Sequence, residues 1–432
     1  MSARCRRRSE LSRRAFCAAS VAAFGAAAQA CGLRRLERTR ATLWYSYGGR
    51  NRETLERLVR SYNAKEHRYA LRSVFQGDYY EGLAKLRLAL AAHAAPSLSH
   101  VIAEVIPYLD YAGVLEPLDG YEGAADLDVL PALGQRGTWA GGFRHRLVAL
   151  PFNRSTPIAY LDGELFERHR LAAPATWYEL RETARILTVR RAGRVERFGF
   201  ECPISWWFWL ALVAQAGGAL VDEDGSVSLG GEAGVEALEF WQTMVHRDRT
   251  MKPPPGRDAN ANEAVNKDYL SRRAAMIWNS TAFLKYFEDH ARFPVTAAAL
   301  PRGRRRGVPT GGTFFVLLRQ APDGEKEAAW SFLRFMLEPE QVIEWSASTG
   351  YLPVTRSAVE RLEAQGYYEK HPNHRVAYEQ LQVASAWPWS PDLFRVQREI
   401  LEPLIERAVL TDGDARRMLS EARARARQIV LR

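Results

Sequence analysis

The chain has 432 residues, of which 47% are hydrophobic and 25% charged, and its 60 Lys and Arg exceed its 50 Asp and Glu to leave a formal net charge of +10. This length exceeds what a single hydrophobic core ordinarily organises, and no repeat array indicates a solenoid. The Arg residues are dispersed and do not alternate with aromatic residues, so the basic charge does not indicate a nucleic-acid-binding surface.

The N-terminus has the features of an export signal. Ser12-Arg13-Arg14-Ala15-Phe16 matches the twin-arginine pattern, a short apolar run follows, and Ala28-Gln29-Ala30 fits the small-x-small cleavage rule. We therefore predict a twin-arginine-type signal peptide over residues 1–30. Cys31 comes directly after it and predicts lipidation of a new N-terminal cysteine. The alternative is a chance cysteine beside a soluble cleavage site, because Ala28 stands where a lipoprotein signal prefers Leu.

Cysteine and histidine usage predicts neither a disulfide nor a metal site. After removal of the signal only Cys31 and Cys202 remain, and acylation of Cys31 would leave no pair. There is no Cys-x-x-Cys motif, and His371 and His374 lie together without a third ligand nearby. We expect no metal and no cofactor.

The first third of the chain alternates between strand and helix patterns. Residues 41–47 and 71–75 read as strands, and residues 98–102 form a nearly continuous apolar run typical of a parallel strand covered on both faces. Between these strands, leucines recur at helical spacing. The alternation predicts βαβ units.

The remaining chain continues this mixed pattern. Thr176 and Glu179 form a capping box for a helix. Arginines at positions 302, 304, 305 and 306 predict an exposed loop over residues 302–307. Further helices are predicted over residues 205–215, 232–245, 260–272, 325–337, 339–345, 401–410 and 414–430, and further strands over residues 198–200, 275–278 and 295–300.

Three stretches read as extended connections. In the first, residues 150–160, Pro151 and Pro157 favour a stiff extended chain that is expected to turn Asn153, Ser155 and Thr156 outward. Two others, residues 310–315 and 349–354, have the same mixed character. Three extended crossings between two bodies of sequence predict a two-lobed, hinged binding protein.

These stretches resemble the extracytoplasmic solute-binding proteins of ABC importers, in the sugar-binding group, and most closely the glycerol-3-phosphate-binding component. The resemblance extends from about Thr42 to the C-terminus. The subgroup-specific motifs are Pro151-Phe152-Asn153 with Ser155-Thr156-Pro157, Thr349-Gly350-Tyr351-Leu352-Pro353, and Gly366-Tyr367-Tyr368-Glu369-Lys370. Residues 112–119 and 176–180 match the wider superfamily.

The resemblance implies an α/β, two-lobed periplasmic-binding-protein fold of type II. Each lobe would be a βαβ-type sheet flanked by helices, and three extended crossovers would join the lobes. We assign residues 41–150 and 312–349 to lobe 1, and residues 151–311 and 350–432 to lobe 2, which would include a helical C-terminal region.

The resemblance also implies a set of ligand-binding residues. Glu104 would accept hydrogen bonds from glycerol hydroxyls, Trp207 would form an apolar wall, and Gly312 would contribute its backbone. The full set is Tyr79, Glu104, Ser155, Trp207, Ser280, Gly312, Tyr351 and Arg395. Alternatives stay open for several of these: Glu104 as a plain surface carboxylate, Gly312 as a conformational requirement only, and tryptophans as core.

The cation for a phosphate departs from the family pattern. The family supplies an Arg from a longer C-terminal loop, whereas residues 387–395 are shortened here, so Arg395 aligns only across a gap. If that match fails, Arg154 is an alternative cation beside the cleft. A neutral sugar stacked on Trp387 and Trp389 is a further alternative.

The function implied is that of a binding component of an ABC importer. It would capture sn-glycerol 3-phosphate or a glycerophosphodiester and deliver it to a membrane permease with its ATPase. The alternatives are a di- or oligosaccharide-binding protein on the same fold, or a ligand-sensing partner protein. An enzyme is not expected, because there is no G-x-S-x-G elbow, P-loop or metal-ligand set. We expect a monomer that binds no nucleic acid, located in the periplasm or at the outer face of the cytoplasmic membrane.

Overall fold

The computed structural model describes residues 38–130, 133, 146–222, 225–253 and 259–430. The signal peptide over residues 1–30 and the lipidation site at Cys31 were predicted in a part of the chain that lies outside these residues. Among the helices that are described, none has the length and apolar character needed to cross a membrane.

The first sheet has five strands in the order β2-β1-β3-β11-β4. Its strands are β1 (Thr39–Tyr45), β2 (Tyr69–Phe75), β3 (Leu98–Ile102), β4 (Leu150–Ser155) and β11 (Gly311–Leu317). β1 pairs in parallel with β2 and β3, and α2 (Gly49–Lys65) and α3 (Tyr79–Ala91) make the connections. The βαβ prediction is therefore confirmed. β11 returns from much later in the chain and runs antiparallel to both β3 and β4.

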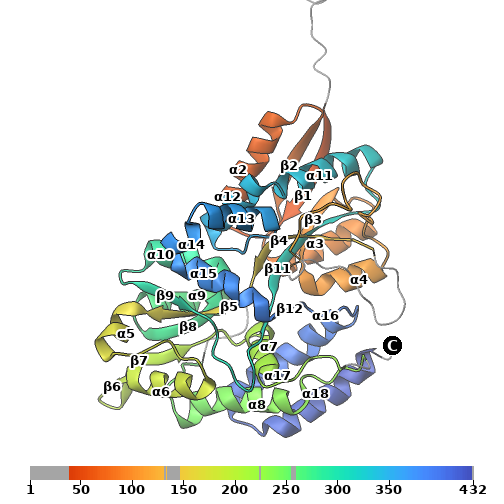
Figure 1. The fold of residues 1–432 in the computed structure, drawn as a ribbon. Helices are drawn as coiled ribbons and strands as arrows, with labels where there is room; N and C mark the ends of the chain where they lie inside the picture. Colours follow the sequence, from red (N-terminus) through yellow and green to blue (C-terminus); the bar gives the residue numbers. More distant parts are fainter. Residues whose placement is uncertain (1–37, 131–132, 134–145, 223–224, 254–258, 431–432) are drawn as a thin grey trace, which may run out of the picture.

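The second sheet also has five strands, in the order β6-β7-β8-β5-β9. Its strands are β5 (Pro157–Asp162), β6 (Val189–Arg191), β7 (Arg194–Glu201), β8 (Ala274–Ser280) and β9 (Val295–Ala298). β7 and β8 are parallel, while β5 runs antiparallel to both β8 and β9. In Figure 1 the first sheet lies in the upper body and the second in the lower body. The two-lobed α/β prediction is confirmed.

Helices surround both sheets (Figure 1). Beside the first sheet lie η1 (Ala103–Val105), α4 (Ile106–Tyr111), α11 (Asp323–Met336) and α12 (Pro339–Thr349). Beside the second sheet lie α5 (Gly163–His169), α6 (Trp177–Leu187), α7 (Trp206–Gln215), α8 (Gly231–Gln242), α9 (Ala259–Leu270), α10 (Leu284–His290), α14 (Tyr367–Lys370) and α15 (Pro372–Glu379). α13 (Arg356–Ala364) packs against α12 (Figure 1). The C-terminal helical region comprises α16 (Leu393–Val396), η5 (Gln397–Leu401), α17 (Glu402–Thr411) and α18 (Ala415–Val430).

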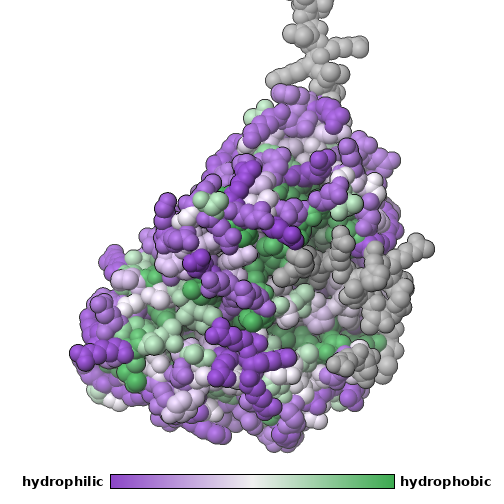
Figure 2. All heavy atoms as spheres, viewed as in Figure 1, coloured by the Kyte–Doolittle hydropathy of each residue, from purple (hydrophilic) through white to green (hydrophobic). Residues whose placement is uncertain are grey.

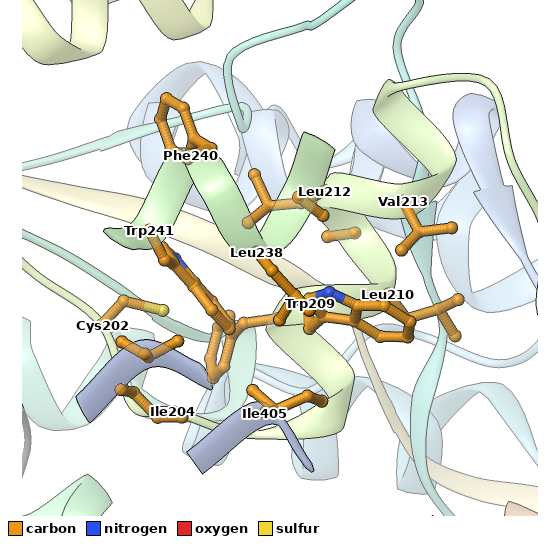
Figure 3. Packing of buried hydrophobic residues seen from close by; sticks show 14 of the residues in the cluster. Cys202, Ile204, Trp209, Leu210, Leu212, Val213, Leu238, Phe240, Trp241 and Ile405 are labelled. Atoms are coloured by element: carbon orange, nitrogen blue, oxygen red, sulfur yellow. The ribbon is translucent and has the colours of Figure 1, made fainter. Parts of the chain in front are cut away.

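The core of the second lobe is built around α7. This helix is apolar on nearly every side, so it can be stable only when other elements enclose it. Trp209 on α7, Trp241 on α8 and Ile405 on α17 are fully buried in one cluster, as Figure 3 shows. The C-terminal helices therefore form part of the core of this lobe.

The three crossings lie side by side. Only Thr156 separates β4 of the first sheet from β5 of the second. Ser155 pairs with Gly311 at the second crossing, and the N–H of Leu352 in the third donates to the carbonyl of Arg154 at 2.8 Å. β4 pairs with β11 as far as Ser155, so the chain changes from the first sheet to the second at Thr156.

The prediction that the first crossing turns Asn153, Ser155 and Thr156 outward is wrong. Their exposed fractions are 0%, 3% and 0%. The physical reason is that the other crossings and the flanking helices cover this strand. The Asn153 side-chain oxygen accepts from the N–H of Thr313 at 2.7 Å, and Gln380 donates to the Thr156 hydroxyl at 3.1 Å. The polar character of this stretch serves internal hydrogen bonding.

Gly312 is required where the second crossing enters the first sheet. Its φ is +96°, and a Cβ placed on it would lie 1.8 Å from the carbonyl oxygen of Asn153. A side chain is therefore excluded by both backbone conformation and space.

We expect Gly312→Ala to lower the melting temperature much more than Gly193→Ala. Gly193 also has a positive φ, of +76°, but nothing within 4 Å of its Cβ position, so it reports the left-handed strain of about 1–2 kcal/mol alone. The clash at Gly312 adds to that strain. Thermal unfolding of both variants measures the difference, and equal losses would show that contact with Asn153 is unimportant.

Candidate functional site

Three tyrosines from separate segments meet at the junction of the lobes. Tyr47 follows β1, Tyr79 opens α3, and Tyr351 lies in the third crossing. Tyr351 is 7% exposed and stacks on Trp345 with ring centroids 5.7 Å apart. The Asn153 amide donates to the Tyr79 hydroxyl at a long 3.5 Å. The junction therefore holds a cluster of phenol groups, which we call the tyrosine cluster.

Burial governs the chemistry of this cluster. It raises the pKa of Tyr351 well above its usual range, and the neighbouring Tyr79 hydroxyl raises it further. Burial raises the pKa of Tyr47 in the same way. The three hydroxyls are therefore neutral at physiological pH and can both donate and accept hydrogen bonds. The Tyr47 hydroxyl is buried without a partner.

The tyrosine at the start of α3 is held by a helix cap. The Asp78 carboxylate accepts from the backbone N–H groups of Tyr80 at 2.7 Å and Glu81 at 2.8 Å, and the Glu81 carboxylate accepts from the N–H of Asp78 at 3.3 Å. This capping box fixes where the helix begins. Tyr79 occupies the first helical position and is thereby directed to the junction.

A buried carboxylate and a buried guanidinium lie beside the tyrosine cluster. Glu104 in η1 is 6% exposed, and Arg154 in β4 is 2% exposed. One Arg154 nitrogen, Nη2, donates to the Thr310 hydroxyl at 2.9 Å, and the guanidinium lies 4.3 Å from the centroid of the Phe314 ring. Nε and Nη1 of Arg154 and Oε2 of Glu104 are buried without hydrogen-bond partners.

Burial favours the neutral forms of both Glu104 and Arg154. It raises the pKa of Glu104 to about 7, against the opposing effect of the Arg154 charge and with a contribution from Glu402. Burial likewise lowers the pKa of Arg154 to about 10, while the Glu104 charge opposes that change. At neutral pH Arg154 is therefore still a cation, and Glu104 is close to half-protonated.

The second lobe contributes Trp207 and Ser280. A Cβ on Gly311 would lie 2.8 Å from the Trp207 ring, so this indole packs directly on the second crossing. Its Nε1 is buried without a partner. Ser280, at the end of β8, pairs with Pro157, and its hydroxyl accepts from the N–H of Ala282 at 3.2 Å.

The structure brings seven of the eight predicted site residues to the crossings. Tyr79 and Glu104 come from the first lobe, Trp207 and Ser280 from the second, and the remainder from the crossings themselves. The set is Tyr79, Glu104, Ser155, Trp207, Ser280, Gly312 and Tyr351. Glu104 is not the plain surface carboxylate that was the alternative reading.

Arg395 is placed differently. Its side chain is 53% exposed, and its Nε donates to the Glu399 carboxylate one helical turn away at 2.8 Å. Among the contacts of the described residues, none joins its side chain to the seven residues above. The indole of Trp387 is 5% exposed and meets Trp206 edge-on at 4.7 Å, so it belongs to the core. Trp389 packs against the first-lobe cluster.

A contact between η5 and α3 joins the two lobes and was not predicted from the sequence. The Arg398 guanidinium in η5 lies 3.9 Å from the centroid of the Tyr80 ring in α3. Arg398 also donates to the Glu402 carboxylate at 2.5 Å. These residues are far apart in sequence and carry no motif, so only their spatial contact identifies them.

The junction is suited to binding a polar ligand. Buried polar atoms without partners cost free energy. Such atoms occur in several parts of the described chain, and at the junction they lie on Tyr47, Glu104, Arg154 and Trp207. These unpartnered groups include both hydrogen-bond donors and hydrogen-bond acceptors. In the part of the chain that the structure describes, no group of three or more His, Cys, Asp or Glu side chains could hold a metal ion.

A separate cavity of about 740 Å³ lies beside α2 and α11. It is lined by aromatic residues such as Tyr62 and Trp330 together with charged side chains. The Trp330 indole donates to the carbonyl of Glu122 at 3.1 Å, and the Tyr62 hydroxyl donates to that of Ala328 at 3.4 Å. These two donors are paired within the protein, whereas the junction holds buried polar atoms without partners, so the junction is the stronger candidate. Figure 2 shows apolar residues gathered in the middle of the visible face between hydrophilic margins.

Two mixed sheets joined by three adjacent crossings are the fold of type II periplasmic binding proteins. The chain belongs to the bacterial extracellular solute-binding protein family, whose sequence profile matches residues 57–375. It is 24% identical over 373 residues to the sn-glycerol-3-phosphate-binding periplasmic protein UgpB of Yersinia pseudotuberculosis, covering 82% of this chain and 83% of that one.

Solved structures have the same fold. UgpB from Mycobacterium tuberculosis in complex with glycerophosphocholine superposes with a TM-score of 0.79 at 23% identity, covering 90% of this chain and 98% of that chain. The cyclic alpha-maltosyl-1,6-maltose binding protein from Arthrobacter globiformis has a TM-score of 0.74 at 22% identity, with 91% and 99% coverage.

Glu104→Gln should stabilise the ligand-free protein more at pH 8 than at pH 5. The folded-state pKa of about 7 exceeds the ordinary value of 4.5, so folding favours the protonated carboxyl. The free energy of unfolding therefore falls as pH rises from about 4.5 to 7 and stays reduced above that range. Gln removes this loss.

Melting temperatures of wild type and variant at both pH values test this. Glu399→Gln, at an exposed carboxylate, controls for the general loss of one negative charge. A Glu104→Gln effect that is the same at pH 5 and pH 8 would contradict the burial argument.

Proposed function

We propose that the chain captures sn-glycerol 3-phosphate or a related glycerophosphodiester between two hinged lobes and delivers it to an ABC permease. The observation that carries this proposal is the chemistry of the junction. A buried cation, a buried carboxylate and the tyrosine cluster lie there with hydrogen-bond donors and acceptors that have no partner in the protein. The names of the relatives support the ligand class. Closure of the lobes would enclose the ligand and present one closed shape to the permease.

The residue roles follow the chemistry of the site. Glu104 accepts hydrogen bonds from the glycerol hydroxyls, and the hydroxyls of Tyr79 and Tyr351 contact the polar backbone of the ligand. Trp207 covers it with an apolar face. Ser155, Ser280 and the backbone of Gly312 complete the polar contacts. The family resemblance assigns the phosphate to Arg395, whose side chain is exposed and paired with Glu399.

Location and partners are part of the same proposal. A twin-arginine signal over residues 1–30 would export the folded chain, and a lipid on Cys31 would keep it at the outer face of the cytoplasmic membrane. There it would act as a monomer that serves a permease and its ATPase, without catalytic activity of its own.

A neutral di- or oligosaccharide is the alternative ligand. The observation that favours it is the indole of Trp207 at the crossings, since aromatic faces pack against sugar rings, together with structural neighbours such as maltose-bound MalE3 of T. maritima, with a TM-score of 0.76. A ligand-sensing role toward a partner protein would use the same closed form.

Calorimetric titration of the chain from Gly32 onward with sn-glycerol 3-phosphate, glycerophosphocholine and maltose separates these readings. A ligand at 100 times its dissociation constant should stabilise the fold by roughly 2.7 kcal/mol. Binding of a glycerophosphate compound supports the proposal. Binding of maltose alone replaces it with the sugar alternative.

Tyr351→Phe should weaken glycerophosphate binding about 2- to 12-fold, because a net hydrogen bond is worth roughly 0.5–1.5 kcal/mol. The ring and its stacking on Trp345 are kept, so the melting temperature should change little. Tyr178→Phe, at a tyrosine that is 71% exposed, is the matched control. Equal affinities of the two variants would remove Tyr351 from the site.

A further inference from the structure

Resting on the proposed function, we propose that the anionic phosphate of the ligand binds to Arg154 at the first crossing, rather than to Arg395. Glu104 then accepts from a hydroxyl on the same ligand. The site selects compounds that carry a phosphate and a hydroxyl group close enough to reach both side chains.

The state of the Arg154 guanidinium is the first argument. It is 2% exposed, and only Nη2 has a protein hydrogen-bond partner, the Thr310 hydroxyl. Nε and Nη1 are buried without partners. A buried cation without paired hydrogen bonds is costly, and a guanidinium fork matches the oxygens of a phosphate. A bound phosphate would complete these missing contacts.

The relation of Arg154 to Glu104 is the second argument. Strand pairing places the two residues near each other: Gly312 pairs with Arg154, and the next residue, Thr313, pairs with Ile102, two residues before Glu104. Arg154 Nε and Nη1 and Glu104 Oε2 all have no hydrogen-bond partner, so no direct hydrogen bond between these atoms joins the two side chains. A ligand with an acceptor anion at one end and a donor hydroxyl at the other satisfies both sides, whereas a phosphate ion supplies chiefly the first.

The other arginines near the junction are already engaged. The Arg395 side chain is 53% exposed and paired with Glu399. Ion pairs that are exposed to water contribute little free energy. Arg398 lies on the Tyr80 ring and donates to Glu402. Of these three arginines, Arg154 alone combines deep burial with unpartnered nitrogens.

The place of Arg154 in the chain links anion binding to the hinge. Its carbonyl accepts from the N–H of Leu352 in the third crossing, and its Cα lies opposite Gly312 of the second. A phosphate on its guanidinium would therefore be held at the point where the three crossings meet. The anion would therefore bind at the hinge formed by the crossings, and both lobes could close over it.

The test is a calorimetric titration of Arg154→Met, Arg154→Lys, Arg395→Gln and wild type with sn-glycerol 3-phosphate and glycerophosphocholine. Arg154→Met should weaken binding of both probes at least tenfold, because it removes hydrogen bonds to a charged group. Arg154→Lys keeps the charge without the fork, so it should recover part of the loss. Arg417→Gln, another exposed arginine paired one turn away, is the matched control for Arg395→Gln.

A larger loss from Arg395→Gln than from Arg154→Met overturns this inference and leaves the proposed function intact. Failure of the wild type to bind either glycerophosphate overturns the proposed function, and the inference with it. If Arg154→Met does not fold, Arg154→Lys decides alone: wild-type affinity for both probes would overturn the inference, and a loss of threefold or more would support it.

Discussion

The lateral pairing of the three crossings is the constraint on which the rest of the structure depends. Ser155 pairs with Gly311, and the N–H of Leu352 donates to Arg154, so segments from three distant parts of the chain form one narrow band. This band connects the two sheets, because β4 and β11 belong to the first sheet and β5 belongs to the second. It also covers Asn153 and Arg154, and thereby creates the buried polar setting of the site.

The same burial leaves the ligand-free junction in an unfavourable state. Polar atoms without partners on Tyr47, Glu104, Arg154 and Trp207 cost free energy that the apolar clusters of the two lobes must offset. Separation of the lobes would admit water to these groups, and a ligand with matching donors and acceptors would replace that water. The unpaired groups thus favour either hydration or occupancy over a dry, empty closed form.

Regular elements were predictable because local pattern determines them. β3 matches the predicted residues 98–102, where every position is apolar or buried, and Thr176 caps α6 as expected. Exposure at the first crossing was mispredicted, because Thr313, Gln380 and Leu352 cover it from far along the chain. The grouping of the site residues came from the family resemblance. The engagement of Arg395 with Glu399 and the open nitrogens of Arg154 depend on three-dimensional contacts that no sequence pattern encodes.

The single-residue connection at Thr156 limits how the molecule can move. The N–H of Thr281 donates to the Thr156 carbonyl at 3.0 Å, and Gln380 donates to its hydroxyl, so even this one residue is tied to the second lobe. Sliding of one lobe past the other would break these hydrogen bonds and those between the three crossings, whereas bending about the crossings would keep them. The expected relative motion of the lobes is therefore a hinge bend. A fluorescent donor on one lobe and an acceptor on the other would therefore follow the whole conformational change through one distance.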